Sequence, residues 1–277
     1  MKILSIGNSY SYYWTDELWG LLNAAGYEDV RVSNLYYSGC TFERHWNWYI
    51  NGELNQTLYT VVDGEKTGEK FVVLEHALSA DNWDIICFQQ SNRYGTQQMR
   101  ESIKAHLPLL YDLAKSRYPD AKYYWQQNWA HEVLQGDTPR GEVSLESQAA
   151  RTNAFRVIAK EVCAEYGFTN IPLGDAWEPV RHDPIFYEKG EGDAPIRSMH
   201  TRIQHAGKMK GEIINRDMSH DGDLGGGQYL NACVWFETIT GQSCIGNTWR
   251  PNDYSLSEAK IAALQQAAHR AVAEARG

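Results

Sequence analysis

Two short polar segments, far apart in the chain, contain the residue types of a nucleophile and a base. The first is GNSYS at residues 7–11, where Ser9 follows an apolar run that ends at Gly7. The second is DMSH at residues 217–220, which begins with Asp217 and ends with His220. A serine hydroxyl attacks an acyl carbon when a base removes its proton, and the usual base is a histidine oriented by a carboxylate. Ser9, His220 and Asp217 are therefore a candidate catalytic triad.

Both segments also have structural interpretations. A serine after a strand is often the N-cap of the next helix, where its side chain accepts a backbone hydrogen bond. Asp217, Asp221 and Asp223 cluster with glycines as in a calcium loop, but the spacing of an EF-hand is absent. The HExxH and paired CxxC patterns of zinc sites are absent too, as are the GxxxxGK[ST] and GxGxxG phosphate loops. We therefore expect no metal ion and no organic cofactor.

The predicted elements place Ser9 at the edge of a sheet. Apolar runs at residues 3–6, 30–37, 83–90 and 121–130 and a short run at 170–173 predict strands. Apolar periodicity predicts helices over residues 14–25, 98–117, 145–166 and 226–240, and a capping box of Ser255 and Glu258 predicts a last helix. This alternation is typical of a mostly parallel sheet with helices on both faces. Ligands bind such sheets at the carboxyl ends of the strands, where Ser9 lies.

The segment at residues 57–74 departs from this alternation. Two β-rich runs flank DGEKTG, which predicts a β-hairpin that we interpret as an excursion from the main sheet. We find no internal repeat and no low-complexity tract. The sequence therefore predicts one α/β domain over residues 1–277.

With these polar segments in this order, the chain resembles the SGNH, or GDSL-like, hydrolases from Ile3 to about Gly241. The chain most resembles a branch with a GNS-[FY]-S block, and the matching segments are GNSYS, the Gly39 of YYSGC, and DMSH. The resemblance implies a flavodoxin-like three-layer α/β/α sandwich and ester hydrolysis. It implies that Ser9 attacks the ester, that His220 transfers the proton and that Asp217 orients His220. It also implies that the backbone N–H groups of Ser9 and Gly39 bind the oxyanion, together with a side-chain amide.

The chain departs from the family pattern in the block that supplies this side-chain amide. The family usually has GxND after the third parallel strand, whereas this chain has FQQSNRYG at residues 88–95. Gln89, Gln90 and Asn92 each carry an amide. Because side chains alternate along a strand, Gln89 and Gln90 are expected to point to opposite faces. We expect Gln90 to donate to the oxyanion, with Asn92 as the next choice.

The aromatic content suggests the substrate. The chain has 10 Trp and 17 Tyr, and Trp46, Tyr94 and Trp129 fall in segments that follow predicted strands. Aromatic faces beside amides suit the stacking and hydrogen bonding of sugars. We therefore expect these residues to contact substrate in an esterase that removes small acyl groups, such as acetyl, from carbohydrate. The alternatives are a lipase or thioesterase, which would need a wide apolar groove, and a non-catalytic carbohydrate-binding protein.

Composition bears on the partners and the compartment of the protein. The formal net charge is -9 and the sequence has no basic stripe, which argues against nucleic acid. No apolar run reaches the ~18 residues of a membrane helix. The five cysteines are odd in number and lack paired spacing, which favours free thiols in a reducing compartment. We expect a cytoplasmic enzyme acting on a small-molecule or glycan ester; the alternative is a secreted or periplasmic form whose signal peptide has been removed.

Overall fold

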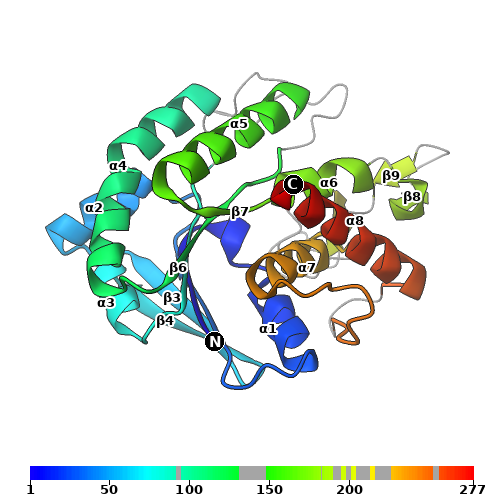
Figure 1. Ribbon diagram of the computed structural model, residues 1–277, viewed down its shortest axis with the longest axis horizontal. Coiled ribbons are helices and arrows are strands. Elements are labelled where there is room, and N and C mark those ends of the chain that lie inside the picture. The colour runs from blue at the N-terminus through cyan, green and yellow to red at the C-terminus, as the bar shows by residue number, and fades with distance from the viewer. Residues whose placement is uncertain are drawn as a thin grey trace.

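A seven-stranded sheet forms the middle layer of a three-layer α/β/α sandwich, as predicted (Figure 1). The computed structural model describes residues 1–91, 95–130, 148–181, 183–189, 195–197, 201–203, 213–215, 226–251 and 256–277. The strands of the sheet are β1 (Lys2–Gly7), β2 (Arg31–Tyr36), β3 (Gln56–Val62), β4 (Glu65–Val72), β5 (Ile85–Phe88), β6 (Lys122–Gln126) and β7 (Thr169–Ile171). Their order is β4-β3-β2-β1-β5-β6-β7, so β1 is central.

Helices cover both faces of this sheet (Figure 1). They are α1 (Thr15–Ala24), α2 (Phe42–Asn51), α3 (Leu74–Ser79), α4 (Thr96–Arg117), α5 (Gln148–Tyr166), α6 (Leu173–Val180), α7 (Gly227–Thr240) and α8 (Glu258–Arg276). Two short 3-10 helices are η1 (Ser9–Ser11) and η2 (Pro184–Phe186). Two small antiparallel pairs lie outside the main sheet: β8 (Tyr187–Lys189) with β9 (Pro195–Arg197), and β10 (Thr201–Ile203) with β11 (Ile213–Asn215).

Strands β2, β1, β5, β6 and β7 run parallel, whereas β3 and β4 are antiparallel. The predicted hairpin is therefore present, but it is not an excursion, because β3 pairs with β2 from Tyr36 against Thr57 to Arg31 against Val62. Its turn is the two-residue Asp63-Gly64 with both φ angles positive (52° and 78°), which matches the twist of a hairpin. The hairpin thus extends the main sheet.

Side chains of the central strands alternate between two apolar layers. Ile3 of β1 and Ile85 of β5 pack in the cluster that includes α1, α6, α7 and α8. Leu4 and Ile86 pack in the cluster that includes α2, α3, α4 and α5. All four side chains are buried, as the apolar runs predict for strands covered on both faces. The sheet therefore has no solvent-facing side at its centre, and the polar side chains within its central strands, such as Ser33 and Asn34, are buried too.

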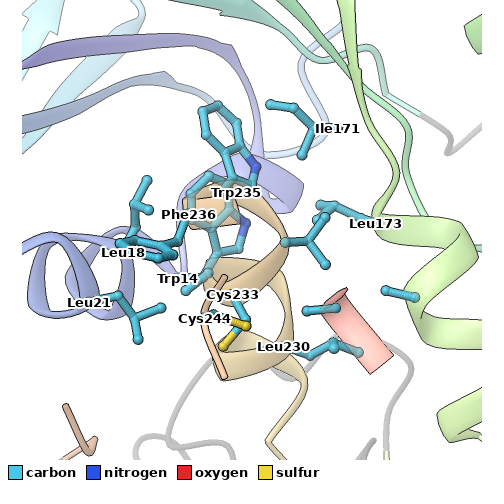
Figure 2. Packing of buried hydrophobic residues seen from close by; sticks show 14 of the residues in the cluster. Trp14, Leu18, Leu21, Ile171, Leu173, Leu230, Cys233, Trp235, Phe236 and Cys244 are labelled. Atoms are coloured by element: carbon cyan, nitrogen blue, oxygen red, sulfur yellow. The ribbon is translucent and has the colours of Figure 1, made fainter. Parts of the chain in front are cut away.

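Helix α7 is the most enclosed helix, and its neighbours hold it against the sheet (Figure 2). The Trp235 ring lies 4.7 Å from that of Trp14, and its Nε1 donates to Gln126 Oε1 at 3.1 Å. Cys233 and Cys244 lie side by side in the same cluster. All five cysteines are free thiols, as predicted. This packing fixes the position of Gly227, where α7 begins.

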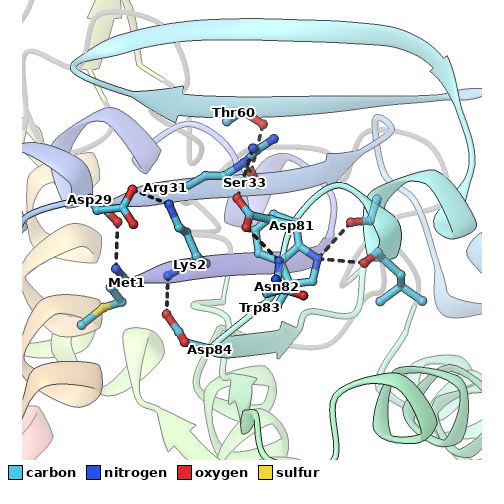
Figure 3. Close-up of polar contacts among 12 residues, drawn as sticks. Met1, Lys2, Asp29, Arg31, Ser33, Thr60, Asp81, Asn82, Trp83 and Asp84 are labelled. Carbon is cyan, nitrogen blue, oxygen red and sulfur yellow. Dashed lines mark hydrogen bonds and ion pairs between the residues drawn. The ribbon is translucent and has the colours of Figure 1, made fainter.

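Ion pairs join the amino-terminal ends of the strands (Figure 3). Lys2 Nζ lies 2.5 Å from Asp29 Oδ1, and Arg31 lies 3.2 Å from Asp81. The Lys2 backbone N–H also donates to Asp84 Oδ2 at 2.7 Å. Exposed ion pairs of this kind contribute little to stability. These contacts lie at the edge of the sheet opposite Ser9.

Three helical features differ from the sequence prediction. The N-cap of α8 is Ser257, whose Oγ accepts from the Lys260 backbone N–H at 3.2 Å, and not Ser255, which lies outside the described residues. The short helices α3 and α6 were not predicted, because neither is long enough to give a clear helical periodicity. Within the described residues, no helix combines the length and the apolar character needed to cross a membrane.

Candidate active site

Ser9 lies at the carboxyl end of the central strand β1, at the start of η1. Asn8 caps this 3-10 turn, because its side-chain Oδ1 accepts from the Tyr10 backbone N–H at 3.0 Å. Ser9 is therefore not the cap, which removes the main structural explanation for a serine at this position. Its side chain is half-buried, and none of the hydrogen bonds among the described residues uses its hydroxyl. The hydroxyl is thus available at this edge of the sheet.

Buried amides from both neighbouring strands hold the turn. Gln89, which follows β5, accepts from the Asn8 backbone N–H with Oε1 at 2.9 Å. Asn34 of β2 donates from Nδ2 to Ser11 O at 3.0 Å and to Ser11 Oγ at 2.7 Å. Both amides are fully buried. Because buried hydrogen bonds between fixed groups are costly to leave unmade, they give the Ser9 backbone one defined position.

A third anchor comes from α2. His45 is completely buried and its Nε2 lies 3.0 Å from Gly7 O. A carbonyl only accepts, so Nε2 carries the proton and Nδ1 accepts from Gln56 Nε2. Burial lowers the pKa of His45 to about 4, although the bond to Gly7 opposes the shift. His45 is therefore neutral near pH 7 and cannot be the catalytic base, since both ring nitrogens are occupied.

The turn after β2 lies against the Ser9 turn. Asn8 Nδ2 donates to Cys40 O at 3.0 Å, and the preceding Gly39 has a φ of 61°, a left-handed conformation that favours glycine. Among the described residues, no hydrogen bond occupies the backbone N–H of Ser9 or of Gly39. Burial raises the pKa of the Cys40 thiol well above its ordinary value, so this thiol is protonated and is not a competing nucleophile.

Gln90 contacts a different element from Gln89, as the alternation of the strand suggests. Its Oε1 accepts from the backbone N–H groups of Phe42 at 3.1 Å and Ser91 at 2.9 Å. These two donors fix the orientation of the amide. Its Nε2 is buried and has no hydrogen-bond partner among the described residues. Gln90 therefore retains an unused donor at the carboxyl edge of the sheet.

Comparisons with known proteins agree with this architecture. Residues 2–136 match the family described as "Domain of unknown function (DUF4886)". A DUF4886 family protein from Bacteroides uniformis ATCC 8492 is similar in structure, with a TM-score of 0.77 and 27% identity over 99% of this chain and 95% of that chain. A candidate GDSL-like lipase from Parabacteroides merdae ATCC 43184 gives a TM-score of 0.50 and 12% identity over 87% of this chain and 96% of that chain. No curated protein matches.

The chain shares the fold of GDSL-like lipases. The three-layer sandwich predicted from the sequence motifs is thus confirmed. Within this GDSL-like fold the described residues contain no cluster of three or more potential metal ligands. Asp217, His220, Asn92 and Tyr94 lie outside the described residues, so their distances from Ser9 stay predictions.

The two predicted aromatic contacts that the structure describes have different environments. Trp46 of α2 is half-buried, with its ring 5.5 Å from that of Tyr49. Trp129 is 5% exposed, and its ring stacks on Trp177 at 4.7 Å and lies 4.5 Å from Tyr10. The structure thus places Trp129 in the core behind the Ser9 turn and not on an open rim. A contact of Trp129 or Trp46 with substrate stays a prediction.

Sequence reasoning missed the residues that hold the turn. His45 is one of nine histidines and belongs to no recognisable motif, and Asn34 lies within an ordinary strand. One signal was present: Asn34 and Gln89 are polar residues inside or directly after apolar β-runs, and Gln56 is the first residue of a strand. A buried polar side chain needs a partner, so each of them indicates a specific tertiary contact.

Substituting Gly7 with alanine is expected to disturb this turn. The added Cβ would lie 2.5 Å from Ser11 Oγ and 2.6 Å from Gln89 Oε1. Both atoms are held by hydrogen bonds, so neither can move freely. Overpacking of this kind costs about 1–3 kcal/mol, which thermal or urea unfolding would detect. Unfolding curves identical to those of the wild type would show that the turn is looser than these contacts indicate.

Proposed function

We propose that this protein is a serine ester hydrolase that removes small acyl groups, such as acetyl, from carbohydrate esters. The observation that carries the proposal is the Ser9 hydroxyl, which is half-buried and unbonded at the carboxyl end of the central strand. The turn that presents it is fixed by buried amides from both neighbouring strands. Preorganisation of this kind is what a nucleophile needs and a helix cap does not.

The proposed reaction uses the SGNH pattern of residues. Ser9 Oγ attacks the acyl carbon while His220, oriented by Asp217, takes its proton. His220 then returns the proton to the departing alcohol, which leaves an acyl group on Ser9. Water, deprotonated by the same histidine, attacks this acyl-enzyme and releases the carboxylic acid and the free serine. No metal or organic cofactor takes part in these steps.

The oxyanion that forms in each step needs donors. The unoccupied N–H groups of Ser9 and Gly39 support their proposed role, since both turns meet at Asn8 and Cys40. The unpartnered Nε2 of Gln90 supports this residue as a third donor, and Asn92 is the alternative. Removing one such donor typically lowers kcat by about 100- to 1,000-fold.

The test is a series of p-nitrophenyl esters together with covalent labelling. We expect hydrolysis of the acetate that falls steeply from butyrate to octanoate, because the pocket lined by Gln90 and the first turn of α2 has only about 290 Å³ and is lined mostly by polar residues. A fluorophosphonate probe should form one adduct, and mass spectrometry of peptides should place it on Ser9. Faster hydrolysis of the octanoate would favour the lipase alternative. Absence of both hydrolysis and labelling would favour a non-catalytic binding protein.

A further inference from the structure

A pocket of about 290 Å³ lies beside the Ser9 turn, between the first turns of α2 and α4. Its lining includes Thr41, Glu43, Arg44, Gln90, Met99 and Ser102. Thr41 directly follows Cys40, whose carbonyl oxygen accepts from Asn8 next to the nucleophile. Gln89, the neighbour of Gln90, also accepts from the Asn8 backbone N–H, so the pocket adjoins the residues that hold the Ser9 turn. Its volume is at the lower end of the range of small-molecule sites, roughly 300–1,000 Å³, which suits a group the size of one sugar ring.

Two of the lining residues have buried polar atoms without partners. Gln90 is 1% exposed, and its Nε2 has no acceptor among the described residues. The orientation of its amide is fixed, because Oε1 already accepts from the Phe42 and Ser91 backbones. Ser102 Oγ is likewise buried without a partner. Buried polar atoms are rarely left unpaired in native proteins, so these two atoms point to a ligand that the pocket binds.

The charges of the pocket indicate the class of ligand. Arg44 and Glu43 belong to the same turn of α2, and within the described residues neither takes part in an ion pair. Their formal charges cancel, which argues against a site built for a strong anion. The pocket offers N–H donors from Arg44, acceptors from Glu43 and hydroxyl groups that do both. Gln90 Nε2 carries two hydrogens, so one can serve the sugar while the other serves the oxyanion. Sugar hydroxyls match this mixture, because each of them donates and accepts.

We propose that this pocket binds the neutral, polyhydroxylated alcohol part of the ester substrate. The inference rests on the proposed function and adds the place where the sugar is recognised. It locates that recognition between α2 and α4, away from Trp129. Arg44 and Ser102 are then specificity-determining residues, whereas Ser9 carries the chemistry.

The experiment compares 6-O-acetylglucose with p-nitrophenyl acetate, an ester without a sugar. Arg44→Met is expected to lower the ratio of the two kcat/KM values about tenfold, and Ser102→Ala about fivefold, since each removes one or more hydrogen bonds to the sugar. The matched controls are Arg100→Met and Ser116→Ala, which change the same residue types on α4 outside the pocket lining. Both controls should keep the wild-type ratio.

Binding separates this inference from the proposed reaction. Calorimetry with 6-O-acetylglucose on the Ser9→Ala background should show a Kd that rises about tenfold when Arg44→Met is added. Such binding without any hydrolysis by the wild type would support the pocket and refute the hydrolase. An unchanged ratio and an unchanged Kd in both pocket variants would overturn the pocket. Tighter binding of 6-O-acetylglucose by Glu43→Gln would overturn it too. Such a result would mean that the Glu43 carboxylate weakens binding and does not accept hydrogen bonds from the sugar.

Discussion

Ser9→Ala should lower kcat for p-nitrophenyl acetate by at least about a thousandfold. The substitution removes only the hydroxyl group, and this group is the proposed nucleophile. Loss of a triad serine costs about a millionfold in well-studied serine hydrolases, and the oxyanion donors retain a residual rate. The melting temperature should change little, since no described hydrogen bond uses the Ser9 hydroxyl and the turn is capped by Asn8. Steady-state kinetics and thermal unfolding of the same preparation would measure both effects.

The same five-residue segment supplies the matched control, Ser11→Ala. Ser11 is fully buried, and its Oγ lies 2.7 Å from Asn34 Nδ2 and 3.3 Å from Gln89 Oε1. Removing this hydroxyl leaves buried groups with fewer partners, which costs about 1–3 kcal/mol. Ser11→Ala should therefore lower the melting temperature and keep a measurable turnover rate. The opposite pattern, with Ser11 essential and Ser9 dispensable, would refute the assignment of the nucleophile.

The stability of the protein should fall as the pH decreases from 6.5 to 4, in part because of His45. In the unfolded chain a histidine takes up a proton near its ordinary pKa of about 6.5, whereas burial lowers the pKa of His45 in the folded protein to about 4. Between these values the unfolded state binds the extra proton, so acid favours unfolding. The contribution is complete above pH 6.5, and about 3 kcal/mol of it is lost by pH 4.

The variant His45→Gln isolates this contribution. A glutamine can still donate from Nε2 to Gly7 O, but it does not titrate. Urea unfolding at pH 7 and at pH 4.5 should show a smaller loss of unfolding free energy in His45→Gln than in the wild type. His45→Leu removes the donor as well, so at pH 7 it should be less stable by about 1–3 kcal/mol and should turn over more slowly. Parallel pH curves for wild type and His45→Gln would show that burial does not lower the pKa of His45.

Local patterns in the sequence determined the layered architecture. A strand with a continuous apolar run, such as residues 3–6 or 83–90, has apolar side chains on both faces of the sheet. Both faces must therefore be shielded from water, and the intervening helices shield them. The position of Ser9 followed from the same logic, because the residue after a parallel strand lies at the edge where ligands bind. The hairpin was also evident from its turn residues, since Asp-Gly between β-rich runs permits the positive φ angles of the turn.

Only the tertiary structure decided how the turn at Ser9 is held. Gln89, Asn34 and His45 come from three different elements, and no local spacing shows that they meet at residues 7–11. The same holds for the pairing of β3 with β2, because a hairpin pattern does not specify which sheet edge it joins. Trp129 shows the limit most clearly: an aromatic residue after a strand has the same local sequence whether it faces solvent or stacks on Trp177. Propensity and periodicity act between neighbours along the chain, whereas burial and hydrogen bonding depend on which distant residues the fold brings together.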